Sequence, residues 1–125
     1  MSKQLMEVVL PRLARPLYRQ LQRYRAGKLD DAQFTRGFEA LLRRQHAWLA
    51  HHGVPETRAA LAIHGAVLIL SSPGLRAEAA EAKLPLEVIE FRAVEEAAAD
   101  VSANYGMSER KAFRILSSLV ARYGD

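Results

Sequence analysis

The sequence predicts an all-α protein, an orthogonal or bundle-like arrangement of five or six helices around a buried central helix at about residues 56–72. Apolar residues recur at steps of three and four, and nothing alternates as a strand does. From Ala59 to Leu70 the one polar side chain is His64, so a helix there has no face for water and must lie in the core. Prolines and glycines separate the helical patterns.

The overall composition is that of a soluble globular protein, and a chain of 125 residues is expected to form one domain over residues 1–125. There is no cysteine, which excludes disulfides, thiolate metal sites and cysteine nucleophiles. No signal-peptide pattern is seen, so we expect a cytoplasmic location. The central apolar run is shorter than the roughly 20 residues that cross a bilayer, and we expect no membrane partner.

The net charge of +4 is unevenly distributed along the chain. Residues 1–53 and 107–125 carry an excess of Lys and Arg, whereas residues 54–106 carry an excess of Asp and Glu. A basic surface favours an anionic partner such as nucleic acid. The alternative is that the acidic and basic parts face each other within the fold or in a dimer.

The first helical pattern covers about residues 3–26. Pro11 and Pro16 interrupt it, so we expect a short first helix, a break or kink between about Leu10 and Arg15, and a longer second helix. Four arginines fall opposite its apolar stripe and form a candidate phosphate-contacting ridge: Arg12, Arg15, Arg19 and Arg23. A merely solvated helix face is the other interpretation of this ridge.

The next helix is expected to follow Gly27, to be capped by Asp30 and to run to about His52. Its predicted buried face consists of Phe34, Phe38, Leu41, Leu42, Trp48 and Leu49. The histidines of this segment are not spaced by four, so they do not share a helix face as a paired metal site requires: His46, His51 and His52. The sequence therefore predicts no metal site, and no cofactor is expected.

The central helix is expected to start at Pro55. We interpret His64 as a buried histidine with one satisfied hydrogen bond; a haem or metal ligand is the alternative, but no motif places a second ligand. Gly65 should let a neighbouring helix cross closely. Ser71 to Gly74 predicts a turn, followed by a short helix from Leu75 to Ala82.

A further helix is predicted from Leu86 to Tyr105. Its expected buried positions are Val88, Ile89, Phe91, Val94, Ala97, Ala98 and Val101. The opposite side is acidic and unfavourable for nucleic acid, with Glu87, Glu90, Glu95, Glu96 and Asp100.

The last predicted helix follows a stop at Gly106 and runs from about Glu109 to Tyr123. Its apolar residues lie on one side, and hydrogen-bond donors occupy the other together with the capping serine: Ser108, Arg110, Lys111, Arg114, Ser117, Ser118 and Arg122. Phosphates and base edges need donors, and arginine supplies them as a fork. These residues are the candidate nucleic-acid surface; the alternative is an amphipathic helix that docks on the core with a solvated basic face.

The residues ADVSANYGMSERKAFRIL resemble a helix-turn-helix DNA-binding motif, within about residues 93–122 and most closely at 99–118. Gly106 takes the turn position, and Val101, Tyr105, Met107, Ala112 and Ile115 take the inward positions. A second likeness, to ANTAR-type RNA-binding domains, rests on the segment from Ala93 to Ala97 and on Gly106, Ser108, Ala112, Phe113 and Leu116. Ala98, Ala99 and Asp100 depart from that pattern, so DNA is the stronger expectation.

The leading functional hypothesis is a DNA-binding transcriptional regulator that acts through this C-terminal helix-turn-helix. A homodimer or another protein partner is also considered, because palindromic half-sites match a two-fold protein. The alternative is a non-catalytic helical protein–protein interaction module or a dimeric structural protein. We expect no enzyme, because the sequence has no nucleotide-binding loop, no metal spacing and no nucleophile–base set.

Overall fold

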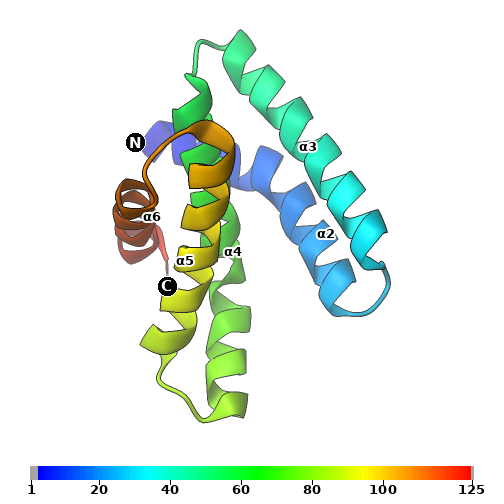
Figure 1. The fold of residues 1–125 in the computed structure, drawn as a ribbon, viewed down its shortest axis with the longest axis vertical. Coiled ribbons are helices and arrows are strands. Elements are labelled where there is room, and N and C mark those ends of the chain that lie inside the picture. Colours follow the sequence, from blue (N-terminus) through cyan, green and yellow to red (C-terminus); the bar gives the residue numbers. More distant parts are fainter. Residues whose placement is uncertain (1–2, 125) are drawn as a thin grey trace.

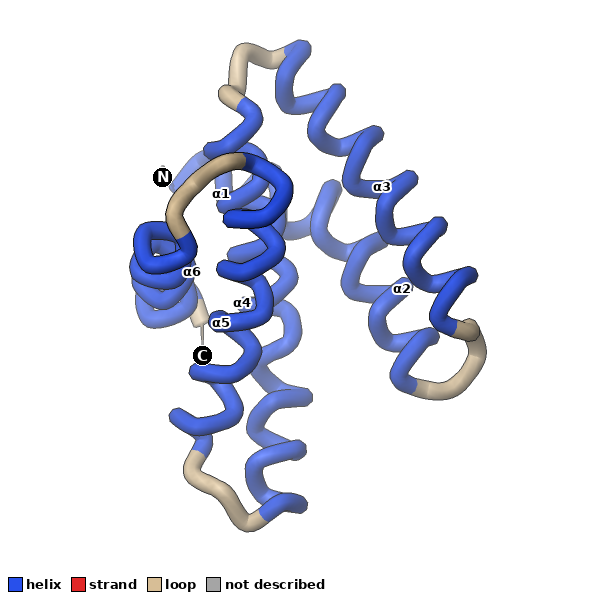
Figure 2. The backbone as a smooth tube through the Cα atoms, viewed as in Figure 1, coloured by secondary structure: helices blue, strands red, loops and turns tan. Residues whose placement is uncertain are grey.

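The computed structural model describes residues 3–124 and is all-α. In chain order the elements are α1 (Lys3–Val9), the π-helical segment η1 (Leu10–Ala14), α2 (Arg15–Arg25), α3 (Asp31–His51), α4 (Glu56–Ala82), α5 (Leu86–Tyr105) and α6 (Glu109–Tyr123). Helices α2 and α3 form one antiparallel pair, α4 and α5 form a second, and α6 lies on the side of α4 and α5 away from α2 (Figure 1). Short loops join the helices (Figure 2).

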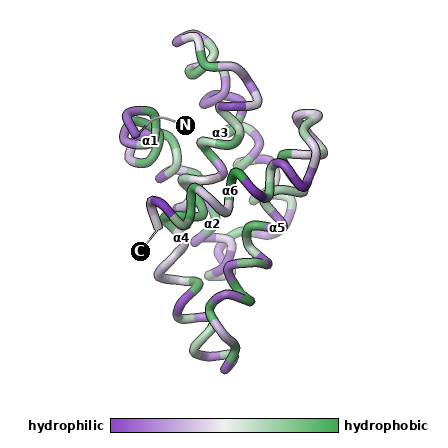
Figure 3. Tube along the Cα trace, turned by 90° about the vertical axis from the view of Figure 1, so that its left-hand side faces the viewer, coloured by the Kyte–Doolittle hydropathy of each residue, from purple (hydrophilic) through white to green (hydrophobic). Residues whose placement is uncertain are grey.

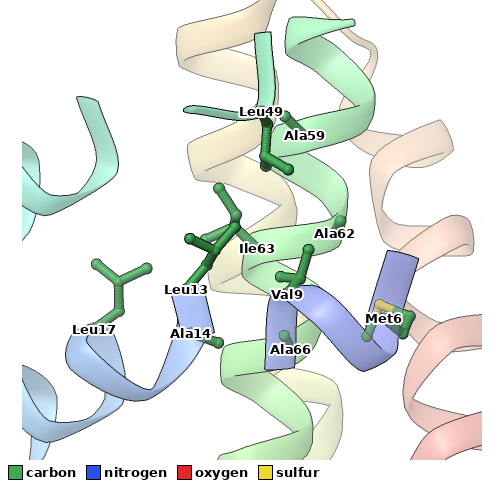
Figure 4. Packing of buried hydrophobic residues seen from close by; sticks show 10 residues of the cluster. All are labelled: Met6, Val9, Leu13, Ala14, Leu17, Leu49, Ala59, Ala62, Ile63 and Ala66. Carbon is green, nitrogen blue, oxygen red and sulfur yellow. The ribbon is translucent and has the colours of Figure 1, made fainter. Parts of the chain in front are cut away.

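The central helix α4 is buried on two faces, which explains why its sequence is apolar all round. One face contacts α1, η1, α2 and α3 through Ala59, Ala62, Ile63 and Ala66, and Figure 4 shows these side chains among Val9, Leu13, Leu17 and Leu49. The other face contacts α5 and α6 through Ala60, Leu61 and Leu68. The predicted buried central helix is confirmed.

Helix α4 is also long and apolar enough to cross a membrane, judged by length and composition alone, and no other helix within residues 3–124 is. Of its most apolar window, 56% is buried inside the protein. A core helix covered by its neighbours has this composition too, because burial in protein and burial in lipid select the same side chains.

The turn predicted at Ser71 to Gly74, and the separate helix after it, are wrong: α4 continues to Ala82. Pro73 lies inside the helix on its exposed side. Proline removes one helical hydrogen bond and crowds the preceding turn. Nearby, the Ser71 hydroxyl donates a hydrogen bond of 2.8 Å to the Val67 carbonyl, so it has a partner within the helix.

Tertiary packing accounts for the continuation of α4 past the proline. Leu75 and Ala79 are buried against Ile89 of α5 and form a small apolar cluster of their own. A helix that ended at Ser72 would leave these side chains in water. The burial of a leucine side chain contributes about 1.5–3 kcal/mol, which is comparable to the cost of a proline in a helix.

The break or kink expected between Leu10 and Arg15 takes the form of η1, and the chain stays helical through it. Pro11 and Pro16 cannot donate backbone hydrogen bonds, and their rings crowd the preceding turn. A locally widened turn is one of the ways in which a helix accommodates such residues. Leu13 and Ala14 are buried in this segment, so η1 contributes to the core.

Three large side chains predicted to be buried are exposed: Trp48, Val88 and Phe91. Trp48 stacks on the His52 ring, with 4.1 Å between ring centroids. Phe91 is 53% exposed and touches Phe113 of α6 at one side, with 5.0 Å between ring centroids. Periodicity marks an apolar face of a helix, but it does not determine whether another helix covers that face.

Candidate nucleic-acid interface

Helices α5 and α6 are joined by three residues, and both predicted helix ends are confirmed. Gly106 follows α5 with a φ of 69°, a left-handed conformation that favours glycine. Ser108 is the N-cap of α6, and its hydroxyl accepts a hydrogen bond of 3.2 Å from the Lys111 backbone N–H. The turn thus fixes where α6 starts relative to α5.

The apolar side of α6 is buried through Ala112, Leu116 and Leu119, which pack against α4 and α5. The close helix crossing predicted at Gly65 is confirmed, because a Cβ atom placed there would lie 2.8 Å from the Leu119 Cδ1 atom. In Figure 1 α6 is seen nearly end-on while α5 runs vertically, so the two helices cross steeply. Helix-turn-helix motifs have such a steep crossing.

The opposite side of α6 carries the predicted donor residues. Figure 3 views the molecule from the side on which α6 lies and shows hydrophilic and hydrophobic positions along it. Ser117 is partly buried, and the others are exposed: Ser108, Arg110, Lys111, Arg114, Ser118 and Arg122. Within residues 3–124, no ion pair engages Arg110, Lys111 or Arg114. These three cations are therefore free to contact an external anion.

The four arginines of the candidate phosphate ridge are also exposed: Arg12, Arg15, Arg19 and Arg23. Arg12 lies on η1, whereas the other three follow one another at steps of four along α2. Helix α2 lies on the opposite side of α4 from α6 (Figure 1). The ridge and the α6 surface therefore do not form one continuous basic face.

The acidic side chains of α5 lie mostly at the surface, with Glu90 partly buried: Glu87, Glu90, Glu95, Glu96 and Asp100. Asp100 borders a groove between α5 and α3. Partial burial raises the pKa of the Asp100 carboxyl, and the nearby Glu96 carboxylate adds to this. Helix α5 therefore has a net negative charge despite Arg92, and α6 has a net positive charge.

The groove beside Asp100 is a second site, and no residue pattern along the chain indicated it. It lies between α3, the first turns of α4 and the last turns of α5. His64 lines it and, contrary to expectation, its ring has no hydrogen-bond partner within residues 3–124. Burial lowers the pKa of His64 to about 4, so the ring is uncharged at neutral pH.

His46 of α3 lines the same groove, and its Nε2 atom is 2.8 Å from the Tyr105 hydroxyl oxygen, a hydrogen-bonding distance. Burial lowers the pKa of His46, although the Glu56 carboxylate opposes this effect. In the described residues, no group of three or more His, Cys, Asp or Glu side chains is arranged to hold a metal ion. Groove residues come from three distant segments, so no local spacing could have grouped them.

No protein-family model, curated protein or solved structure matches this chain. The likenesses of the C-terminal region to a helix-turn-helix and to ANTAR-type domains therefore rest on the sequence of this chain alone.

Proposed function

We propose that this protein is a transcriptional regulator and that it binds DNA through the exposed side of α6. The observation that carries this proposal is the separation of the two sides of α6. The buried part of the apolar side packs against α4 and α5, while Arg110, Lys111 and Arg114 near the N-terminal end are exposed without an ion pair. A recognition helix presents such residues to base edges and phosphates.

The position of α6 supports the same proposal. Its first three residues, Glu109 to Lys111, follow the three-residue connection from α5 and are exposed at the surface. In a helix-turn-helix the N-terminal residues of the second helix contact bases. Ser117, Ser118 and Arg122, further along α6, would then lie beside the sugar–phosphate backbone.

The test is a fluorescence-anisotropy titration with random-sequence duplex DNA at two salt concentrations. The double variant Arg110→Ala and Arg114→Ala should bind more weakly by about 1–3 kcal/mol for each base that an arginine no longer reaches. The slope of log affinity against log salt should become shallower by about one for each phosphate that is no longer neutralised. Exposed substitutions change stability little, so the melting temperature should stay within about two degrees.

A matched control is the double variant Arg36→Ala and Arg44→Ala, which removes two exposed arginines from α3. It changes the net charge equally, so it should lower affinity much less than the α6 variant. If the wild-type protein has no measurable affinity for DNA at low salt, the proposal fails. If the α6 variant unfolds, the arginines support the fold and α6 is not a recognition helix.

The alternative function, a non-catalytic interaction module or dimeric structural protein, is favoured by a separate observation. Leu84, Val88 and Phe91 are large, exposed and close together in the chain where α5 begins. A two-fold dimer needs a self-complementary surface, and a second copy of the chain is the occupant we propose for this apolar surface. Sedimentation should give a dimer that Phe91→Ser dissociates; a monomeric wild-type protein would exclude this surface as a dimer interface.

A further inference from the structure

The groove between α3, α4 and α5 has the size of a small-molecule site. Its volume is about 650 Å³, within the range of about 300–1,000 Å³ that such sites occupy. It is bordered by the middle of α3, by Glu56 and His64 of α4, and by Asp100, Asn104 and Tyr105 at the end of α5. The α6 surface lies elsewhere, so nucleic-acid binding leaves this groove unexplained.

The charge balance of the groove favours a cation. Three carboxylates line it, from Glu39, Glu56 and Asp100, against the one guanidinium of Arg43. Within residues 3–124 none of these carboxylates forms an ion pair. All three side chains are exposed at the rim, and partial burial of the carboxyl group raises the pKa of Asp100. Carboxylates left without a counter-ion attract a cation, most strongly where they are partly withdrawn from water.

Two histidines that line the groove have ring nitrogen atoms without a hydrogen-bond partner in the described residues. The His46 Nδ1 atom is buried and has no hydrogen-bond partner. The His64 ring is largely buried, has no hydrogen-bond partner within the described residues and is uncharged at neutral pH. A neutral imidazole can accept a hydrogen bond from an ammonium N–H, and leaving a buried polar atom unpaired is costly.

One wall of the groove is aromatic. Phe34 stacks on Tyr24, with 4.5 Å between ring centroids, and packs against Phe38 at 5.2 Å. These contacts hold the two phenylalanine rings in place where they line the groove. Ordered aromatic rings accept flat apolar groups by stacking and attract cations through their faces.

We propose that this groove binds a small organic cation, a protonated amine attached to an aromatic body. The aromatic body lies against Phe34 and Phe38, and the ammonium group lies between the Glu56 and Asp100 carboxylates and donates a hydrogen bond to a histidine. The excess of carboxylates over the single guanidinium of Arg43 disfavours an anion of the same shape.

The test compares three probes of similar shape and different charge: tryptamine, which is a cation at pH 7, tryptophol, which is neutral, and indole-3-acetate, which is an anion. Binding is followed by NMR chemical shifts and by calorimetry on the full chain. Tryptamine should shift the signals of His46, His64, Asn104 and Tyr105. It should bind at least about tenfold more tightly than tryptophol, because a charge-assisted hydrogen bond replaces a neutral one.

Three variants locate the site. Glu56→Gln and Asp100→Asn keep the shape of the side chain and remove its charge, so each should weaken tryptamine binding at least about fivefold while tryptophol binding changes little. The matched control is Glu87→Gln, an exposed carboxylate at the far end of α5, which should leave tryptamine binding unchanged.

The proposal is overturned if tryptamine shifts no groove signal, or if tryptophol or indole-3-acetate binds as tightly as tryptamine. Equal loss of affinity in Glu87→Gln and Glu56→Gln would also overturn it, because the effect would then come from the overall charge. If a groove variant does not fold, the comparison of the three probes on the wild-type protein still decides. None of these outcomes depends on whether α6 binds DNA.

Discussion

Gly65 of α4 and Leu119 of α6 are so close that a side chain at position 65 would have no room: a Cβ atom there would lie 2.8 Å from the Leu119 Cδ1 atom. Gly65→Leu should therefore lower the free energy of unfolding by about 1–3 kcal/mol or more, since overpacking displaces α6 or strains the leucines. Urea unfolding followed by circular dichroism measures this.

The same helix offers a matched control for this substitution. Gly74 is helical, and nothing lies within 4 Å of the position that its Cβ would occupy. Gly74→Leu should raise the free energy of unfolding by about 0.5–1 kcal/mol, because leucine favours a helix more than glycine does. Equal effects at the two positions would show that α6 does not cross α4 at Gly65.

Removal of the N-cap of α6 should be measurable. Ser108→Ala deletes the hydroxyl that accepts the Lys111 N–H, so it should cost about 1 kcal/mol of stability. Ser118→Ala, at an exposed position within α6, should change stability by less than about 0.5 kcal/mol. Chemical unfolding of both variants tests the predicted start of the helix, and a neutral Ser108→Ala would place that start elsewhere.

Stability should fall as the pH falls below neutrality, because His64 is buried without a charge. Burial lowers the pKa of His64 to about 4, and His46 acts in the same direction. An unfolded chain binds the proton near pH 6.5, so between the two values protonation favours the unfolded state. The free energy of unfolding should decrease by about 3 kcal/mol between pH 6.5 and 4 from this group.

The histidine contribution is isolated by comparing the wild-type protein with His64→Leu in urea at pH 7 and at pH 4.5. The lowered pKa of His46 acts in the same direction, whereas the raised pKa of Asp100 stabilises the fold as the pH falls through it. Both groups remain in the variant, so the difference between the two proteins reports His64. Parallel pH dependences would mean that His64 is accessible to protons in the folded state.

If the arginine ridge on α2 contacts DNA, its arginines should contribute to affinity without contributing to sequence discrimination, unlike those of α6. Replacing Arg15, Arg19 and Arg23 by alanine should make the salt slope shallower by about one for each phosphate that is no longer neutralised. Discrimination between a preferred and a random sequence should persist, because phosphate contacts carry no sequence information. Titrations with both duplexes measure this. An unchanged salt slope would show that these arginines contact no phosphate and form a merely solvated helix face.

Most of the fold could be predicted because the signals that determine it are local. The period of the apolar residues identified the helices, and Asp30, Gly106 and Ser108 marked three of their ends at the positions observed. Gly65, set in an apolar helix, indicated that a neighbouring helix crosses closely, and the structure shows that this helix is α6. Each of these signals lies within one or two helical turns of sequence, although the identity of the helix that crosses at Gly65 does not.

The errors arise where distant parts of the chain decide the outcome. The segment around Pro73 has turn-forming residues, but burial of Leu75 and Ala79 against Ile89 keeps it helical. The groove has no local signal, because His46, Glu56 and Asp100 are brought together only by the packing of three helices. The expected hydrogen bond of His64 is also absent within the described residues, because its partner would have to come from a distant part of the chain.

The continuation of α4 past Pro73 also determines which part of the protein unfolds most easily. The far end of the α4–α5 pair extends beyond the other helices (Figure 1), and its buried apolar residues are the small cluster of Leu75, Ala79 and Ile89. An element with so few buried side chains can unfold on its own while the rest stays folded. Amide hydrogens of this end should therefore exchange with solvent deuterium well before those around Ile63, and proteases should cut there first.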